Sequence, residues 1–104
     1  MTVDMGLLLK IKTYLRISHP ALDDDISDTI AACFRDLQVC GVSAPAPDNP
    51  QEPDPLILNA VKLYCKAHFT DDTGKAGEFL KRYDALKASL MMASEYSGEA
   101  VTDE

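Results

Sequence analysis

Residues 53–69 read PDPLILNAVKLYCKAHF, and this stretch predicts the centre of the fold. Drawn as a helix, it is apolar over most of its circumference, which is typical of a helix buried in the middle of a domain. The polar exceptions share one narrow stripe: Asn59, Lys62 and Lys66. Asp54 can accept hydrogen bonds from the free N–H groups of the first turn, and Pro55 suits the first helical position because its missing N–H costs nothing there. We therefore expect a central helix that ends near Phe69-Thr70, with the rest of the chain around it.

A first helix is predicted from Thr2 to Arg16, upstream of this centre. Thr2 can cap it and Asp4 suits the positive end of its dipole. Its apolar positions recur at helical spacing, and they are Leu7 or Leu8, Ile11 and Leu15, with Tyr14 beside them. Lys10 and Lys12 are expected to lie off this stripe. Ser18-His19-Pro20 should end the helix, because proline disfavours helical geometry in the residue before it.

A second helix is predicted from Asp23 to about Val39. The run Asp23-Asp24-Asp25 is expected to supply its cap and to place negative charge at its amino end. Its apolar stripe comprises Leu22, Ile26, Ile30, Cys33 and Leu37, widened by Phe34. Ala31 and Ala32 would allow a neighbouring helix to approach closely. Gly41 is the expected stop, just past the last periodic residue.

Residues 42–53 form the longest irregular stretch and include Pro45, Pro47 and Pro50. Prolines at this density exclude a helix or a central strand, so we expect an extended, exposed connection. It is either a linker between two helical hairpins or a loop that reaches a neighbouring subunit.

A last helix is predicted from about Lys75 to Ala93 or Ser94, after a turn at residues 71–74. Its apolar stripe comprises Phe79, Tyr83, Leu86 and Leu90, flanked by Leu80 and Met91. The last helix has four basic residues that are expected to lie mostly outside this stripe: Lys75, Lys81, Arg82 and Lys87. The fold class is therefore all-α, a small bundle of about four helices in a single domain over residues 1–96. Residues 97–104 are small, polar and acidic, which predicts a disordered tail.

Composition limits the classes of function. The chain has 104 residues, 46% of them apolar, and a net charge of −7, which suits one packed domain and does not suit a protein that grips the phosphates of nucleic acid. Neither a bilayer-spanning run nor a signal peptide is recognisable, so we expect a soluble protein kept in a cytoplasm. The charge is uneven, because the first helix is basic while residues 23–25 and 95–104 are acidic. Such asymmetry can serve head-to-tail contacts between subunits, but a solvated surface is the simpler explanation.

The sequence contains no recognisable catalytic, metal or cofactor constellation. Cys33, Cys40 and Cys65 are an odd set without a CxxC pair, which favours buried reduced thiols over disulfides or zinc. His19 lies beside a proline in a turn, and His68 lies at the carbonyl end of the central helix, where a structural role is favoured. Residues 73–77 have the wrong order of glycine and lysine for a P-loop. We predict no enzyme, no cofactor and function through surfaces.

In order and spacing, several motifs resemble the head-to-tail connector proteins of long-tailed bacteriophages, which are also described as head-completion adaptors or DNA-packaging proteins. The matching pieces are Tyr14-Leu15-Arg16-Ile17, Asp23-Asp24-Asp25-Ile26, Ala31-Ala32, Pro55-Leu56-Ile57, Ala60-Val61-Lys62-Leu63-Tyr64, Ala67-His68-Phe69 and, with most weight, residues 79–90, FLKRYDALKASL. The resemblance covers about residues 6–96. The chain departs from many relatives in its proline-dense loop and in an acidic tail that lacks a basic or apolar anchor.

The resemblance implies a structural virion protein, made in the bacterial host cytoplasm and placed at the head–tail junction. Such proteins form a closed ring of about a dozen copies that docks below the portal, extends the DNA channel without sequence-specific binding, and offers a surface to tail or head-completion proteins. It implies no membrane partner. Heterologous contacts between copies would use two different faces. The residues we predict to contact other proteins are Lys10, Lys12, Arg16, Pro45, Pro47 and Pro50.

Three alternatives compete with the connector. The first is a small nucleic-acid-binding regulator with a helix-turn-helix, whose recognition helix would be the last one, with Lys81, Arg82 and Lys87. The overall acidity argues against it. The second is a helical interaction module of another kind, and the third is a small enzyme that stray His and Cys residues alone would support.

Overall fold

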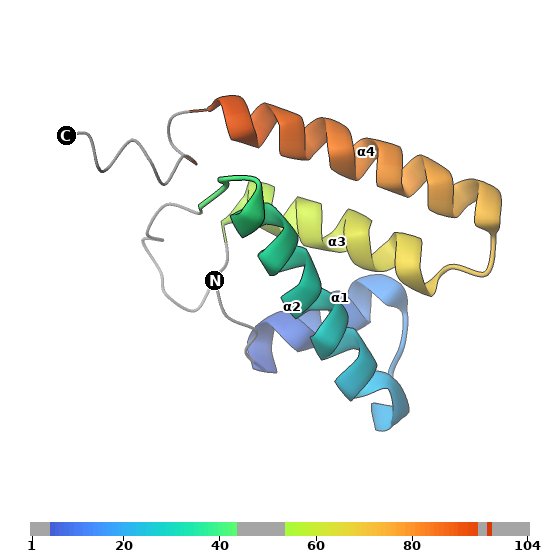
Figure 1. Cartoon of the computed structure of the whole chain (residues 1–104). Helices are drawn as coiled ribbons and strands as arrows, with labels where there is room; N and C mark the ends of the chain where they lie inside the picture. The colour runs from blue at the N-terminus through green and yellow to red at the C-terminus, as the bar shows by residue number, and fades with distance from the viewer. Residues whose placement is uncertain (1–4, 44–53, 94–95, 97–104) are drawn as a thin grey trace.

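The computed structural model describes residues 5–43, 54–93 and 96, and within these ranges it contains helices and no strand. Figure 1 shows the four α-helices, α1 (Met5–Leu15), α2 (Asp23–Val39), α3 (Pro55–Phe69) and α4 (Thr73–Met92), with a short 3-10 helix, η1 (Pro20–Leu22), before α2. The predicted all-α fold is confirmed. The candidate contact residues Pro45, Pro47 and Pro50 lie outside the described residues, as does residue range 97–104.

Helix α3 is the centre of the bundle, as its sequence predicts. It packs against α1, α2 and α4, and it runs beside α4 in the opposite direction (Figure 1). Its buried side chains are Ile57, Ala60, Val61, Cys65 and Ala67. The Asp54 carboxylate caps it by accepting hydrogen bonds from the backbone N–H groups of Leu56 and Ile57 at 3.1 and 3.2 Å. Both the start and the end of α3 match the prediction.

Helix α1 ends at Leu15, and its end differs from the predicted one. Arg16 has a φ of 62°, and the N–H groups of Arg16 and Ile17 donate to the carbonyls of Thr13 and Lys12. This pattern is a Schellman motif, which closes the last turn before Pro20 is reached. Proline is therefore not what ends the helix. The predicted cap, Thr2, lies outside the described residues.

Helix α2 spans the predicted residues, and its buried stripe is confirmed: Ile26, Ile30, Cys33, Phe34 and Leu37. Gly41, with a φ of 88°, ends it through a second Schellman motif that seats the buried Val42. Two predictions are wrong. Leu22 occupies the cap position without a side-chain hydrogen bond, so the aspartates form the first turn instead of the cap. Ala31 and Ala32 are exposed and do not receive a neighbouring helix within the described part of the chain.

Helix α4 begins at Thr73, before the predicted Lys75. The reason is Asp72, whose carboxylate accepts hydrogen bonds from the N–H groups of Gly74 and Lys75 at 3.0 and 3.1 Å and so starts the helix inside the predicted turn. The structure describes α4 throughout, and the helix fully buries just Tyr83 and Leu90. Its packing is mainly against α3.

The described ends of the long connection and of the chain meet beside the start of α3. The buried Val42 does not belong to an exposed connection, contrary to expectation. Ser43 N–H donates to the Tyr96 carbonyl at 2.6 Å, and the buried Tyr96 hydroxyl donates to the Asp54 carboxylate at 2.9 Å. Tyr96 thus joins the core, at the end of the predicted domain.

Candidate protein-contact surface

The three basic residues predicted to contact a partner occupy different environments on α1. Lys10 and Arg16 are exposed. Lys12 is 8% exposed, and its ammonium lies 2.6 Å from the Asp23 carboxylate at the start of α2. The prediction that Lys12 lies off the buried face is therefore wrong. Its charge is neutralised within the chain, because a buried ammonium requires a partner. Lys10 and Arg16 are the α1 cations that can meet another protein.

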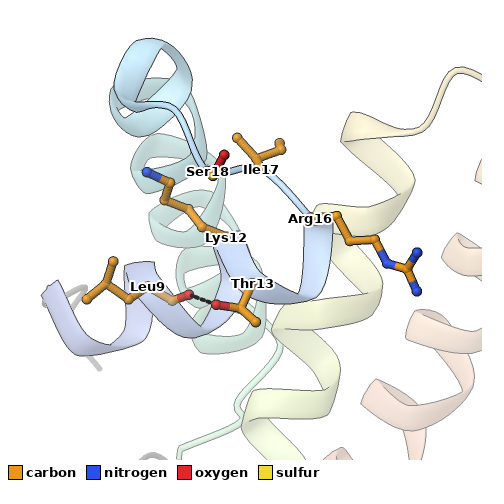
Figure 2. Close-up of a pocket in the computed structure, with 6 residues that line it drawn as sticks. All are labelled: Leu9, Lys12, Thr13, Arg16, Ile17 and Ser18. Atoms are coloured by element: carbon orange, nitrogen blue, oxygen red, sulfur yellow. Dashed lines mark hydrogen bonds between the residues drawn. The ribbon is translucent and has the colours of Figure 1, made fainter.

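Beside these residues the surface carries a shallow hollow of about 410 Å³. It is lined by Leu9, Lys12, Thr13, Arg16, Ile17 and Ser18. Figure 2 shows the Lys12 side chain extending towards the start of α2, while the Arg16 guanidinium extends away from the other five side chains. Thr13 is held by a hydrogen bond from its hydroxyl to the Leu9 carbonyl at 2.9 Å. The lining of the hollow is mainly apolar, and its exposed cation is Arg16.

Apolar side chains are also exposed on the outer side of α1. Met5 is 68% exposed and Leu9 is 54% exposed. They lie four residues apart, which places them on the same side of the helix. Exposed apolar side chains next to an apolar hollow are a feature of protein-contact surfaces.

The polar stripe of α3 packs towards α1 and does not form a site. The ammonium groups of Lys62 and Lys66 lie 5.4 and 5.8 Å from the centre of the Tyr14 ring. Both distances fall within the range of cation–π contacts. The stripe therefore stabilises the junction of α1 and α3.

A polar network that the sequence analysis missed joins α2 to α4. The Tyr83 hydroxyl donates to the Asp36 carboxylate at 2.7 Å, and the Lys87 ammonium contacts the same oxygen at 2.9 Å. The hydrogen bond from Tyr83, followed by that from Lys87, lowers the pKa of Asp36. Burial, followed by the bond to Asp36, raises the pKa of Tyr83. The network joins α4 to α2, and these shifts favour the ionised form of Asp36 and the neutral form of Tyr83.

The histidines have no catalytic arrangement in the described structure. His68 is exposed, its Nδ1 lies 2.9 Å from the Tyr64 carbonyl, and its ring is 4.5 Å from the Tyr64 ring. His19 is exposed before η1. Among the described residues, no group of three or more His, Cys, Asp or Glu side chains is placed to hold a metal ion. None of the described helices is long and apolar enough to span a bilayer.

The thiols should react at different rates. Burial raises the pKa of both Cys33 and Cys65 to about 12, whereas Cys40 is half-buried. Because the thiolate is the reactive form, a water-soluble maleimide should label Cys40 in the native protein and label Cys33 and Cys65 only after unfolding. Mass spectrometry of the labelled chain measures this directly. Fast native labelling of Cys65 would contradict the packing of α3.

Comparison with protein families identifies the chain. The family described as "Phage connector protein" matches residues 7–97, which covers all four helices. The chain belongs to the phage connector protein family. No curated protein and no solved structure gave a significant match. Connector proteins have a structural role and interact with other proteins of the phage head and tail.

The connector assignment and the packing of α4 both disfavour the helix-turn-helix alternative. α3 and α4 form an antiparallel hairpin in Figure 1, whereas the two helices of a helix-turn-helix cross steeply. The proposed recognition helix would need Lys87, whose ammonium is already bound to Asp36.

Proposed function

We propose that this connector forms a closed ring that docks below the portal and extends the DNA channel towards the tail, at the head–tail junction of the virion. The observation that carries the proposal is the family match over residues 7–97. The surface of α1 supports it, because an apolar hollow beside an exposed arginine is suited to contact with a protein. The net charge of −7 also suits a wall past which DNA must slide without adhering.

Electron microscopy of portal mixed with this protein tests the proposal. We expect extra density beneath the portal with the rotational symmetry of a ring. Portal particles that remain bare at saturating concentrations of the connector would reject docking. The purified protein alone should be a monomer or a weak mixture at low concentration, because each contact between copies is small; a stable ring in size-exclusion chromatography with light scattering would contradict that expectation.

Reversing the exposed charges of α1 should weaken assembly. We expect Lys10→Glu and Arg16→Glu each to reduce portal-dependent assembly about two- to fivefold at low salt, in the range of exposed ion pairs. The effect should fade as salt screens the charges. Co-sedimentation with portal particles measures it.

Arg82→Glu is the matched control, because it makes the same charge change at an exposed position on α4. Equal losses in Arg82→Glu and Arg16→Glu would show that net charge, and not the face of α1, controls assembly. Lys12→Glu is unsuitable as an interface variant, since it would place a carboxylate beside Asp23 and destabilise the fold.

The proline-rich loop stays part of the proposal. Pro45, Pro47 and Pro50 are predicted to contact a neighbouring protein, and replacing all three by alanine should lower portal association without unfolding the helices.

A further inference from the structure

We propose that adjacent copies in the ring meet through α1 of one copy and α4 of the next, packed antiparallel. The inference rests on the proposed ring and assigns its subunit contact. The first partner is the α1 face, defined by Met5, Leu9, Arg16 and the hollow beside them. The second is the α4 flank, defined by Leu80, Asp84 and Met91.

The α4 flank is an exposed, partly apolar surface with one open carboxylate. Leu80 is 40% exposed and Met91 is 47% exposed. Spacings of four and seven residues place Leu80, Asp84 and Met91 on the same side of the helix. The Asp84 side chain is 70% exposed, and its nearest cation, the Lys87 ammonium, is 3.9 Å away and closer to Asp36, at 2.9 Å. Asp84 is therefore available to a cation from another copy.

The α1 face offers the complementary charge. Arg16 is exposed and adopts a φ of 62°, a conformation that glycine reaches without steric cost and arginine does not. The Schellman motif fixes the backbone there, so the Arg16 side chain leaves the backbone at a defined point at the end of α1. Figure 2 shows its guanidinium extending away from the other side chains that line the hollow, where a partner can reach it.

The spacing of the two surfaces selects the antiparallel arrangement. The backbone positions of Leu9 and of Arg16, which directly follows the last residue of α1, are about 10 Å apart along the axis of α1, and those of Asp84 and Met91 are about 10 Å apart along α4. An antiparallel pairing sets Met91 against Leu9 and Asp84 against Arg16, with Leu80 directed to the end of α1, near Ile17. A parallel pairing that joins Arg16 to Asp84 would set Leu9 against Gly77 and leave its apolar surface unmatched.

The contact joins two different faces of the chain, so it can repeat from copy to copy around a closed ring. One helix pair buries less than the roughly 1,600 Å² of a standard interface, so each contact is weak alone. This agrees with the expected monomer at low concentration.

Disulfide trapping tests the contact. Two chains are prepared, one with Leu9→Cys and one with Met91→Cys, each also carrying Cys40→Ser to remove the half-buried thiol. Mixed and oxidised at high concentration or on the portal, they should form mixed dimers several-fold faster than Leu9→Cys with Ser89→Cys. Ser89 is exposed and lies two residues before Met91, on nearly the opposite side of α4, so it is the matched control.

A charge swap supplies the second measurement, in chains that carry the trapping cysteines. Arg16→Asp and Asp84→Arg should each reduce the trapping rate about two- to fivefold, and the two together in every chain should restore it. The proposal would be overturned if Ser89→Cys is trapped as fast as Met91→Cys, or if no mixed dimer forms either at high concentration or on the portal. Failure of the double charge swap to restore the trapping rate would also overturn it. Ring density below the portal without trapping would reject this contact and leave the proposed function standing. Trapping without portal density would keep the contact and reject docking.

Discussion

Replacing Asp54 by alanine is expected to lower the free energy of unfolding by about 3 kcal/mol, because one carboxylate oxygen has three roles. It accepts hydrogen bonds from the N–H groups of Leu56 and Ile57, and from the Tyr96 hydroxyl. The loss of an N-cap costs about 1 kcal/mol, and a hydrogen bond to a charged group contributes about 1.5–3 kcal/mol. Urea unfolding followed by far-UV circular dichroism measures the change.

Asp72→Ala is the matched control for this prediction. Asp72 caps α4 through the same two kinds of backbone hydrogen bond, and no side chain from elsewhere in the described chain is seen to bind its carboxylate. Its loss should cost about 1 kcal/mol. A double-mutant cycle of Asp54→Ala with Tyr96→Phe should show positive coupling. If the two cap variants are equally destabilised, the bond from Tyr96 does not stabilise the fold.

The elements that depend on local patterns were predictable from the sequence. The limits of α2 and α3 follow from apolar periodicity, from the Asp54-Pro55 start and from Gly41, all of which act within a few residues. The start of α4 was predicted two residues late, because Asp71-Asp72-Thr73-Gly74 reads both as a turn and as a cap. Local chemistry supports both interpretations, and in the structure the Asp72 carboxylate caps the helix.

The pairings between distant residues were not predictable in the same way. Lys87 binds Asp36, 51 positions away, and Tyr96 binds Asp54, 42 positions away. A lysine beside an apolar stripe normally stays in water, so nothing in the pattern marks Lys87 or Lys12 as partly buried. Arg16 was singled out for its charge, whereas its positive φ could not be expected of an arginine. For the candidate site, the sequence predicted helix α1 but not the conformation of Arg16 at its end.

The second large effect is expected for Tyr83→Ala, at about 4 kcal/mol of unfolding free energy. Tyr83 is 2% exposed, and its ring lies 5.1 Å from the Tyr64 ring on α3. It is one of the two side chains that α4 buries fully. Removing a large aromatic side chain from a core costs about 3–5 kcal/mol, which is a large part of the roughly 5–15 kcal/mol that stabilises an ordinary domain.

Tyr83→Phe separates the ring from the hydroxyl. It keeps the packing against Tyr64 and removes the hydrogen bond to Asp36, which retains Lys87, and the weak one from the Cys33 thiol, so the cost should be about 1 kcal/mol. Urea unfolding of both variants measures the difference, and equal costs would show that the polar network, and not the ring, holds α4. The Tyr83 variants should also affect the proposed contact between copies. Tyr83 is one of the two side chains that α4 buries fully, so Tyr83→Ala should loosen the α4 flank and slow trapping between positions 9 and 91, whereas Tyr83→Phe should keep the trapping rate.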